Sequence, residues 1–145
     1  MQITLSRIEG ARFSATDERG NTTIIDTPEI VGGSNAGFRP MEMLLMGLAG
    51  CTAMDVLVIL QKSGHDVATL DVRVIANRVE AVPAVFSDIH IVFEASGSFN
   101  ERQLARSASL SLDKYCPVAA MLRPGVQITH ETVKKSPSLP SGTID

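Results

Sequence analysis

The 145-residue sequence has little cysteine and no excess of basic charge, and both shortages exclude classes of protein. It has only two cysteines, Cys51 and Cys116, which we expect to be free or redox-active thiols and not a permanent structural disulfide. The net charge of −3 gives no electrostatic reason for nucleic acid or an anionic membrane to be a partner. The three histidines are scattered, and no Cys/His spacing matches a zinc site, so we predict no metal and no cofactor.

Signals for export and for membrane insertion are also lacking. The N-terminal stretch "MQITLSRIEG" alternates like a strand and has neither the basic nor the apolar region of a signal peptide. The uncharged apolar run over residues 43–54 is too short to cross a bilayer, and Glu42 and Asp55 bracket it. We therefore expect a cytoplasmic protein without a membrane partner. The length is typical of one domain, over residues 1–145.

Clear periodicity runs through most of the chain. Alternating apolar and polar residues predict strands at 2–10, 11–18, 21–27, 69–80, 87–97 and 125–134. Helical spacing and capping residues predict helices at 40–62, 100–115 and 116–122. This order predicts an α+β fold in which antiparallel sheets, including a long pair at 69–97, wrap an apolar helix. The polar, proline-rich end, residues 135–145, is expected to be a flexible tail.

The helix expected at 40–62 is apolar on every side, which predicts that it is buried all round. A single small sheet would struggle to cover both sides of such a helix, so we expect a homodimer. Gly47, Gly50 and Ala53 recur every three residues, a spacing that lets another backbone approach closely. Two interpretations stay open: these residues lie beneath the sheet, or they contact another helix, including one across a dimer.

The two cysteines occupy different settings. Cys51 lies mid-helix, so it is either a small buried hydrophobe or a reactive thiol that needs a nearby cation. Cys116, followed by Pro117, is placed at the cap of a short helix, where unpaired N–H groups would favour its thiolate. It could equally be only a cap.

Two quoted stretches carry a family resemblance. "RPMEMLLMGLAGCTAMDVL" is followed, 65 residues after its cysteine, by "DKYCPVAAML". This pattern resembles the OsmC/Ohr family of thiol-dependent hydroperoxide reductases, and is closest to its less characterised OsmC-like branch. The resemblance covers the chain up to about residue 133.

The resemblance implies a fold and a chemistry. It implies an intertwined α+β homodimer with two long central helices and sites at the subunit interface. Cys51 would be the peroxidatic thiol and Cys116 the resolving thiol, with organic hydroperoxides as substrates in preference to hydrogen peroxide. The resulting disulfide would be reduced by lipoyl proteins or other dithiols, and an Arg and a Glu would pair beside the first cysteine.

The activating Glu is where this sequence departs from the family pattern. In the peroxidase branches that Glu directly follows the Pro, whereas here Pro40 is followed by Met41. Glu42 comes one residue later, about 100° further around the helix and about 13 Å along its axis from Cys51. Glu42 is therefore a candidate site residue whose equivalence to the family Glu is not assured.

The activating Arg has two candidates, Arg39 beside the helix and Arg12 in the N-terminal strands. Three functions stay open on these residues. The first is a thiol peroxidase acting in the oxidative stress response, with Cys51, Cys116, Arg39 and Glu42 as its site. The second is a binding protein that keeps the fold, has little or no peroxidase activity and holds a lipid-like ligand in an apolar cleft. The third is a protein with two inert core cysteines.

Overall fold

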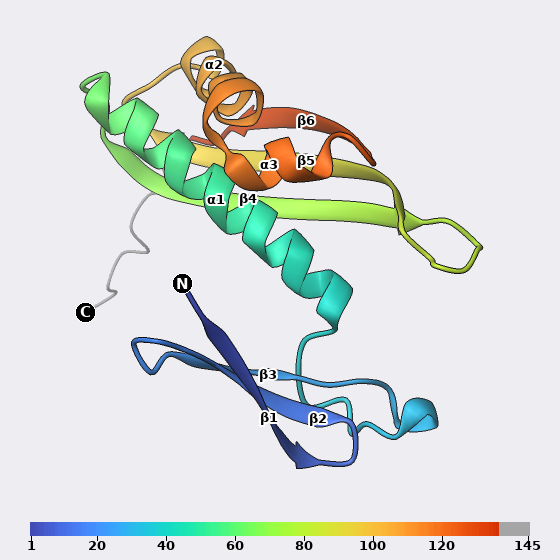
Figure 1. The fold of residues 1–145 in the computed structure, drawn as a ribbon. Coiled ribbons are helices and arrows are strands. Elements are labelled where there is room, and N and C mark those ends of the chain that lie inside the picture. Colours follow the sequence, from blue (N-terminus) through green and yellow to red (C-terminus); the bar gives the residue numbers. More distant parts are fainter. Residues whose placement is uncertain (137–145) are drawn as a thin grey trace, which may run out of the picture. The chain divides into compact units, whose positions relative to one another are not determined.

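The computed structural model describes residues 1–136 and divides the chain into two compact units, Met1–Met46 and the part from Gly47 onward (Figure 1). The predicted tail at 135–145 lies outside the described residues from position 137. Two three-stranded sheets and a long helix confirm the predicted α+β class. Because the helix α1 (Pro40–Lys62) belongs to both units, the single-domain assignment stays a prediction.

The first unit is an antiparallel sheet of β1 (Ile3–Glu9), β2 (Arg12–Asp17) and β3 (Thr22–Ile25), in that order. The turn between β2 and β3 is held by the Asp17 carboxylate, which accepts the backbone N–H groups of Arg19 and Asn21 at 2.8 and 2.9 Å. The three strands predicted at 2–27 are confirmed. A short 3₁₀ turn, η1 (Glu29–Val31), follows in the loop before α1.

Asp26 organises that loop from a fully buried position (0% exposed). Its carboxylate accepts the backbone N–H groups of Thr27 and Ala36 at 2.7 and 3.0 Å and the Ser34 hydroxyl at 2.8 Å. Gly33 is required beside it, because a Cβ there would lie 1.9 Å from the Thr27 carbonyl oxygen. Hydrogen bonds from Ala36 N–H, the Ser34 hydroxyl and neighbouring amides hold the pKa of Asp26 well below its usual range, against the opposing effect of burial.

Acid should remove the contribution of Asp26 to stability. Because its pKa is lower in the folded chain, this contribution is complete above the unfolded value near 3.8 and is lost as the pH falls below it. Asp26→Asn should therefore lower the urea midpoint at pH 7, and the gap to wild type should narrow below pH 4. Asp71→Asn, at an exposed position of the second sheet, is the matched control and should leave the midpoint unchanged. An equal gap at both pH values would contradict this role of the carboxylate.

The second unit contains β4 (Val67–Arg78), β5 (Phe86–Gly97) and β6 (Gln127–Lys134). The long antiparallel pair β4–β5 is confirmed. The prediction that the sheets are wholly antiparallel is wrong for this one, because β6 pairs with β5 in parallel. The helices between β5 and β6 form a crossover connection that returns the chain in the same direction.

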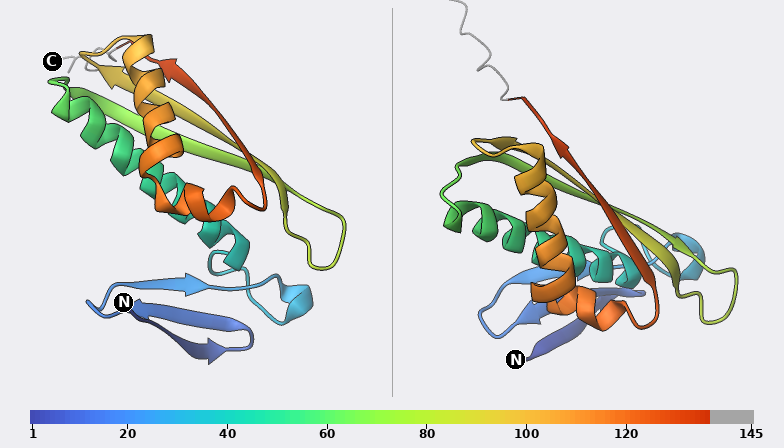
Figure 2. Two further views of the ribbon diagram at one scale, coloured as in Figure 1. Left: turned by 45° about the horizontal axis from the view of Figure 1, so that its top comes forward. Right: turned by 90° about the horizontal axis from the view of Figure 1, so that it is seen from above.

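The crossover consists of α2 (Glu101–Leu110), a π-helical turn η2 (Ser111–Tyr115) and α3 (Pro117–Leu122). It lies on the same face of the second sheet as the part of α1 in this unit (Figure 2). Asn100 begins α2 with a capping box that it shares with Gln103. The prediction of an α-helix through residue 115 is wrong over its last turn, because the Cys116 N–H donates five residues back to the Ser111 carbonyl at 2.8 Å.

The core of the second unit lies between its helices and the sheet. Its largest fully buried apolar side chains are Phe93, Leu48, Leu60, Ile89, Ile91, Leu104 and Val56. The prediction that α1 is buried all round is wrong within the protomer, because its buried residues, Leu48, Thr52, Val56 and Leu60, form one stripe. On other sides of the helix, Met54 and Val58 are 69% and 43% exposed.

Gly47 and Gly50 of α1 lie in open space within the second unit. A Cβ built on Gly47 or Gly50 would meet no atom of that unit's described residues within 4 Å. These glycines therefore do not lie beneath the second sheet, and the interpretation as a helix contact remains. By length and composition alone, α1 also qualifies as a candidate membrane span, with a mean hydropathy of 2.2 over its most apolar 18 residues.

Candidate functional site

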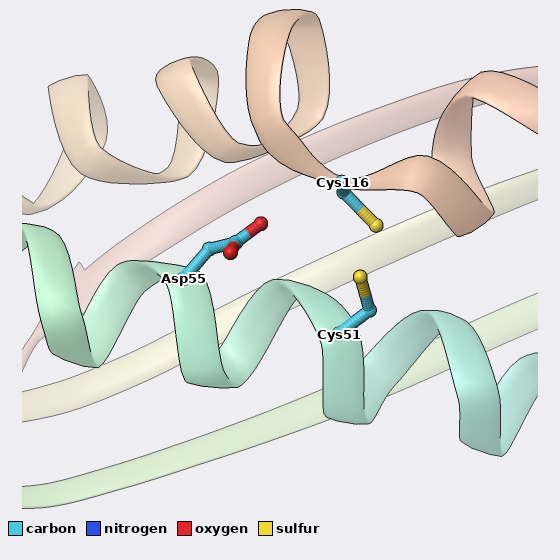
Figure 3. A group of neighbouring side chains, drawn as sticks. All are labelled: Cys51, Asp55 and Cys116. Atoms are coloured by element: carbon cyan, nitrogen blue, oxygen red, sulfur yellow. The ribbon is translucent and has the colours of Figure 1, made fainter.

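Cys51 and Cys116 come together in the second unit although 65 residues separate them in the sequence. Figure 3 shows their sulfur atoms facing each other between α1 and the start of α3. Both thiols are free, Cys51 half-buried and Cys116 only 3% exposed. The two sulfurs and a carboxylate oxygen of Asp55 all lie within 4.8 Å of one another. The structure thus juxtaposes the two predicted thiols, and their roles stay predictions.

Local structure explains how these groups converge. Cys51 and Asp55 are four residues apart on α1, so they occupy the same face of the helix. The π-helical turn η2 ends directly before Cys116, which becomes the N-cap of α3, with Pro117 at the first helical position. Both cysteines are therefore held by secondary structure, which favours a fixed distance between the sulfurs.

The electrostatics of Cys116 differ from the sequence-based expectation. Its sulfur does accept the Ala119 N–H, at 3.3 Å, so the predicted cap exists. The cap amides favour the thiolate as expected, but burial, together with the adjacent Cys51 thiol, raises the pKa of Cys116 to about 11. The Ala119 and Val118 amides act in the opposite direction and do not offset burial. Cys116 is therefore a protonated thiol at neutral pH.

Asp55 and Ser111 complete the cluster, and neither was among the predicted site residues. The fully buried Ser111 hydroxyl donates to Asp55 Oδ2 at 2.8 Å, which fixes the carboxylate beside the sulfurs. A signal for Asp55 was present, because it is the one charged residue of α1 between Glu42 and Lys62 and lies one turn after Cys51. Ser111 carried no such signal, since the π-helical turn determines where it points.

The first unit contains the other predicted site residues, Arg39, Arg12 and Glu42. The Arg39 guanidinium donates to the Asp26 carbonyl, at 3.1 Å, and to the Asn35 side chain. Arg12 contacts Ser34 at 3.4 Å and Glu9 at 3.6 Å.

The Glu42 carboxylate accepts the Arg39 backbone N–H at 2.8 Å. This contact is half of a capping box at the start of α1. The contacts of Glu42 thus identify a structural role, and its role toward Cys51 stays a prediction, as does that of Arg39.

A groove with a volume of about 390 Å³ lies beside the cluster in the second unit. It is lined by Asp55, Val58, Ile59, Lys62 and Tyr115. The volume lies within the range of small-molecule sites, and the lining combines aliphatic side chains with one cationic and one phenolic group. Of the three clustered residues, Asp55 borders this groove.

The structure thus places a half-buried thiol opposite a buried one on an α+β scaffold. The sequence model of the family described as "OsmC-like protein" matches residues 32–131, and the chain belongs to this family. Membership identifies α1 as the core helix of a small soluble domain, which accounts for its length and hydropathy.

Individual relatives agree with this assignment. The chain is 37% identical to Protein YhfA of Escherichia coli (strain K12) over 134 residues, which cover 90% of this chain and 95% of that protein. A structure of a hypothetical protein from Aquifex aeolicus VF5 is 28% identical, with a TM-score of 0.78 and coverage of 92% and 96%. An organic hydroperoxide resistance protein from Elizabethkingia anophelis has the same fold, at 12% identity and a TM-score of 0.68, with coverage of 93% and 97%.

Proposed function

We propose that this protein is a cytoplasmic two-cysteine peroxidase that reduces organic hydroperoxides. The observation that carries the proposal is the pairing of the Cys51 and Cys116 sulfurs within 4.8 Å in a member of the OsmC-like family. Structural neighbours named organic hydroperoxide resistance proteins support the substrate class. A role in the oxidative stress response follows from this chemistry.

The reaction divides between the two thiols. The Cys51 thiolate attacks the outer oxygen of the hydroperoxide, which leaves Cys51 as a sulfenic acid and releases the alcohol. The Cys116 thiol then attacks the Cys51 sulfur, forming a disulfide and releasing water. A dithiol or a lipoyl protein reduces this disulfide, so each cycle consumes one hydroperoxide and two reducing equivalents.

Burial supports this assignment of roles. Cys51 is the more exposed of the two, whereas Cys116 is almost fully buried and protonated at neutral pH. Because the thiolate is the nucleophile, the residue that attacks a peroxide arriving from solvent should be Cys51. We assign the stabilising cation to Arg39, with Arg12 as the alternative.

A peroxide consumption assay tests the function directly. With dithiothreitol or a lipoyl system as reductant, cumene hydroperoxide should be consumed faster than hydrogen peroxide. A protein no faster than free cysteine would refute the proposal. That result would favour the second candidate function, a binding protein that holds an apolar ligand. The observation that supports this alternative is Met41 at the position of the family Glu.

Met41→Glu should raise the peroxidase rate. A carboxylate directly after Pro40 would restore the family order and orient the cation beside the attacking thiol. We expect a gain on the order of tenfold in kcat/KM for cumene hydroperoxide, equivalent to about 1.4 kcal/mol of transition-state stabilisation. Met41→Gln has the same length without the charge and should show no gain. If wild type is already fast and Met41→Glu adds nothing, Glu42 or another group fills this role.

We further propose that the protein is a homodimer. The apolar side chains Ile3 and Leu5 are exposed on the first sheet, and Met54 and Val58 are exposed on α1. A mainly apolar groove of about 290 Å³ also runs over the first sheet. Exposed apolar surface of this kind marks an interaction site, and a second copy of the chain, as the family resemblance implies, would cover it.

A further inference from the structure

Three metal-ligating side chains converge at the redox cluster. The Cys51 and Cys116 sulfurs and one Asp55 oxygen lie within 4.8 Å of one another, and none of the three residues is exposed. In a tetrahedral zinc site the metal is about 2.3 Å from sulfur and about 2.0–2.2 Å from a carboxylate oxygen. Such ligand atoms are about 3.5–3.8 Å apart, so shifts of about 1 Å in the side chains would bring these three into coordination.

We propose that the reduced protein binds one Zn²⁺ through Cys51, Asp55 and Cys116. Both cysteines bind as thiolates, so two thiolates, one carboxylate and the divalent cation form a complex with a net charge of −1. The inference needs only the reduced cluster and is independent of peroxidase activity. It also explains why local sequence spacing predicted no metal site, because the third ligand comes from another element.

The second coordination sphere is already in place. A metal-bound carboxylate is usually oriented by a hydrogen bond to its other oxygen. Here the Ser111 hydroxyl donates to Asp55 Oδ2 at 2.8 Å, so Oδ1 is the oxygen that this hydrogen bond leaves available as a ligand. Ser111 is fully buried, and its position is set by η2, so this support does not depend on a surface side chain.

The donor set selects the kind of metal. Two sulfur ligands favour Zn²⁺ over Mg²⁺ or Ca²⁺, which prefer all-oxygen shells. Three protein ligands leave a fourth position for water or a small thiol. Metal and oxidation therefore compete for the same sulfurs: bound Zn²⁺ withdraws both thiolates from peroxide, and a Cys51–Cys116 disulfide removes two of the three ligands.

Cobalt is the probe that tests this site, because Co²⁺ occupies zinc sites and is coloured. Co²⁺ added to the reduced full-length protein should give sulfur-to-cobalt charge-transfer bands in the near ultraviolet, saturating at one equivalent. Excess Zn²⁺ should abolish them. Protein oxidised to the disulfide should give no bands, and dithiothreitol, removed before the titration, should restore them.

Variants separate the three-ligand site from a simple dithiol. Cys51→Ser and Cys116→Ser should each lose the one-equivalent complex. Asp55→Ala should weaken Co²⁺ binding at least tenfold and Ser111→Ala about tenfold, the usual scale for removing a hydrogen bond to a metal ligand. Asp71→Ala, at an exposed position of β4, should bind as wild type does. Circular dichroism of each variant should match wild type, so that loss of binding is not loss of fold.

Two results would overturn the inference: no charge-transfer bands at one equivalent, or an Asp55→Ala variant that binds Co²⁺ as tightly as wild type. Its failure is distinct from failure of the proposed function. A protein that binds Co²⁺ but does not consume peroxide refutes only the peroxidase. One that consumes peroxide without binding Co²⁺ refutes only the metal site.

Discussion

Cys51→Ser should consume cumene hydroperoxide no faster than the uncatalysed background, a loss of at least about a hundredfold relative to wild type. The remaining thiol, Cys116, is 3% exposed and has a pKa of about 11, so it offers little thiolate to a peroxide arriving from solvent. Initial rates with dithiothreitol as reductant measure this directly.

Cys116→Ser is the matched variant and should behave differently. Its Cys51 should still react once, but it should remain a sulfenic acid and pass to higher oxides under excess peroxide, because the resolving thiol is gone. Dimedone trapping followed by mass spectrometry distinguishes these states. If Cys51→Ser keeps its activity and Cys116→Ser loses it, the two roles are reversed.

Gly50→Leu should convert the dimer into monomers. The glycine lies on α1 with no atom of the second unit's described residues within 4 Å of a built Cβ, so the protomer itself can accept a side chain there. If a second helix approaches at this glycine, a leucine blocks the approach. The molar mass measured by light scattering at micromolar concentration should fall from twice 15.5 kDa for wild type to 15.5 kDa for the variant.

Gln61→Leu adds the same side chain at an exposed position near the end of α1 and should remain dimeric. The free energy of unfolding supplies a second readout. If the protein is a monomer, replacing this glycine, which has no neighbouring side chain in the described part of the second unit, should stabilise the helix by up to about 1 kcal/mol. A wild type that is monomeric, together with a stabilised Gly50→Leu variant, would contradict the homodimer.

The elements that local pattern determines were predictable. Residues 69–80 and 87–97 largely alternate between apolar and polar side chains, and α1 starts at Pro40 and ends before Gly64, whose φ of 83° suits a glycine stop. The direction of β6 was not predictable, because the side-chain period of a strand is the same in parallel and antiparallel pairs. Only the crossover through α2 and α3 sets it.

The candidate site was likewise only partly predictable from the sequence. Cys51 and Cys116 could be predicted as a pair from their family spacing. The helical spacing of Asp55 places it beside Cys51, but Ser111 could not be assigned to the site, since its meeting with Asp55 depends on a π-helical turn that interrupts an apparently continuous helical pattern. The high pKa of Cys116 was not predictable, because sequence indicates the amide donors but not the burial that outweighs them.

The most direct test of a two-cysteine peroxidase is thiol counting on wild type after one equivalent of cumene hydroperoxide. The reduced protein should lose two thiols, and peptide mapping should find one intramolecular disulfide between Cys51 and Cys116. Closing this loop should stabilise the oxidised chain by roughly 4 kcal/mol on the chain-entropy model. If both thiols remain free after this treatment and react with the peroxide no faster than free cysteine, the cysteines are core residues and the proposed function is contradicted.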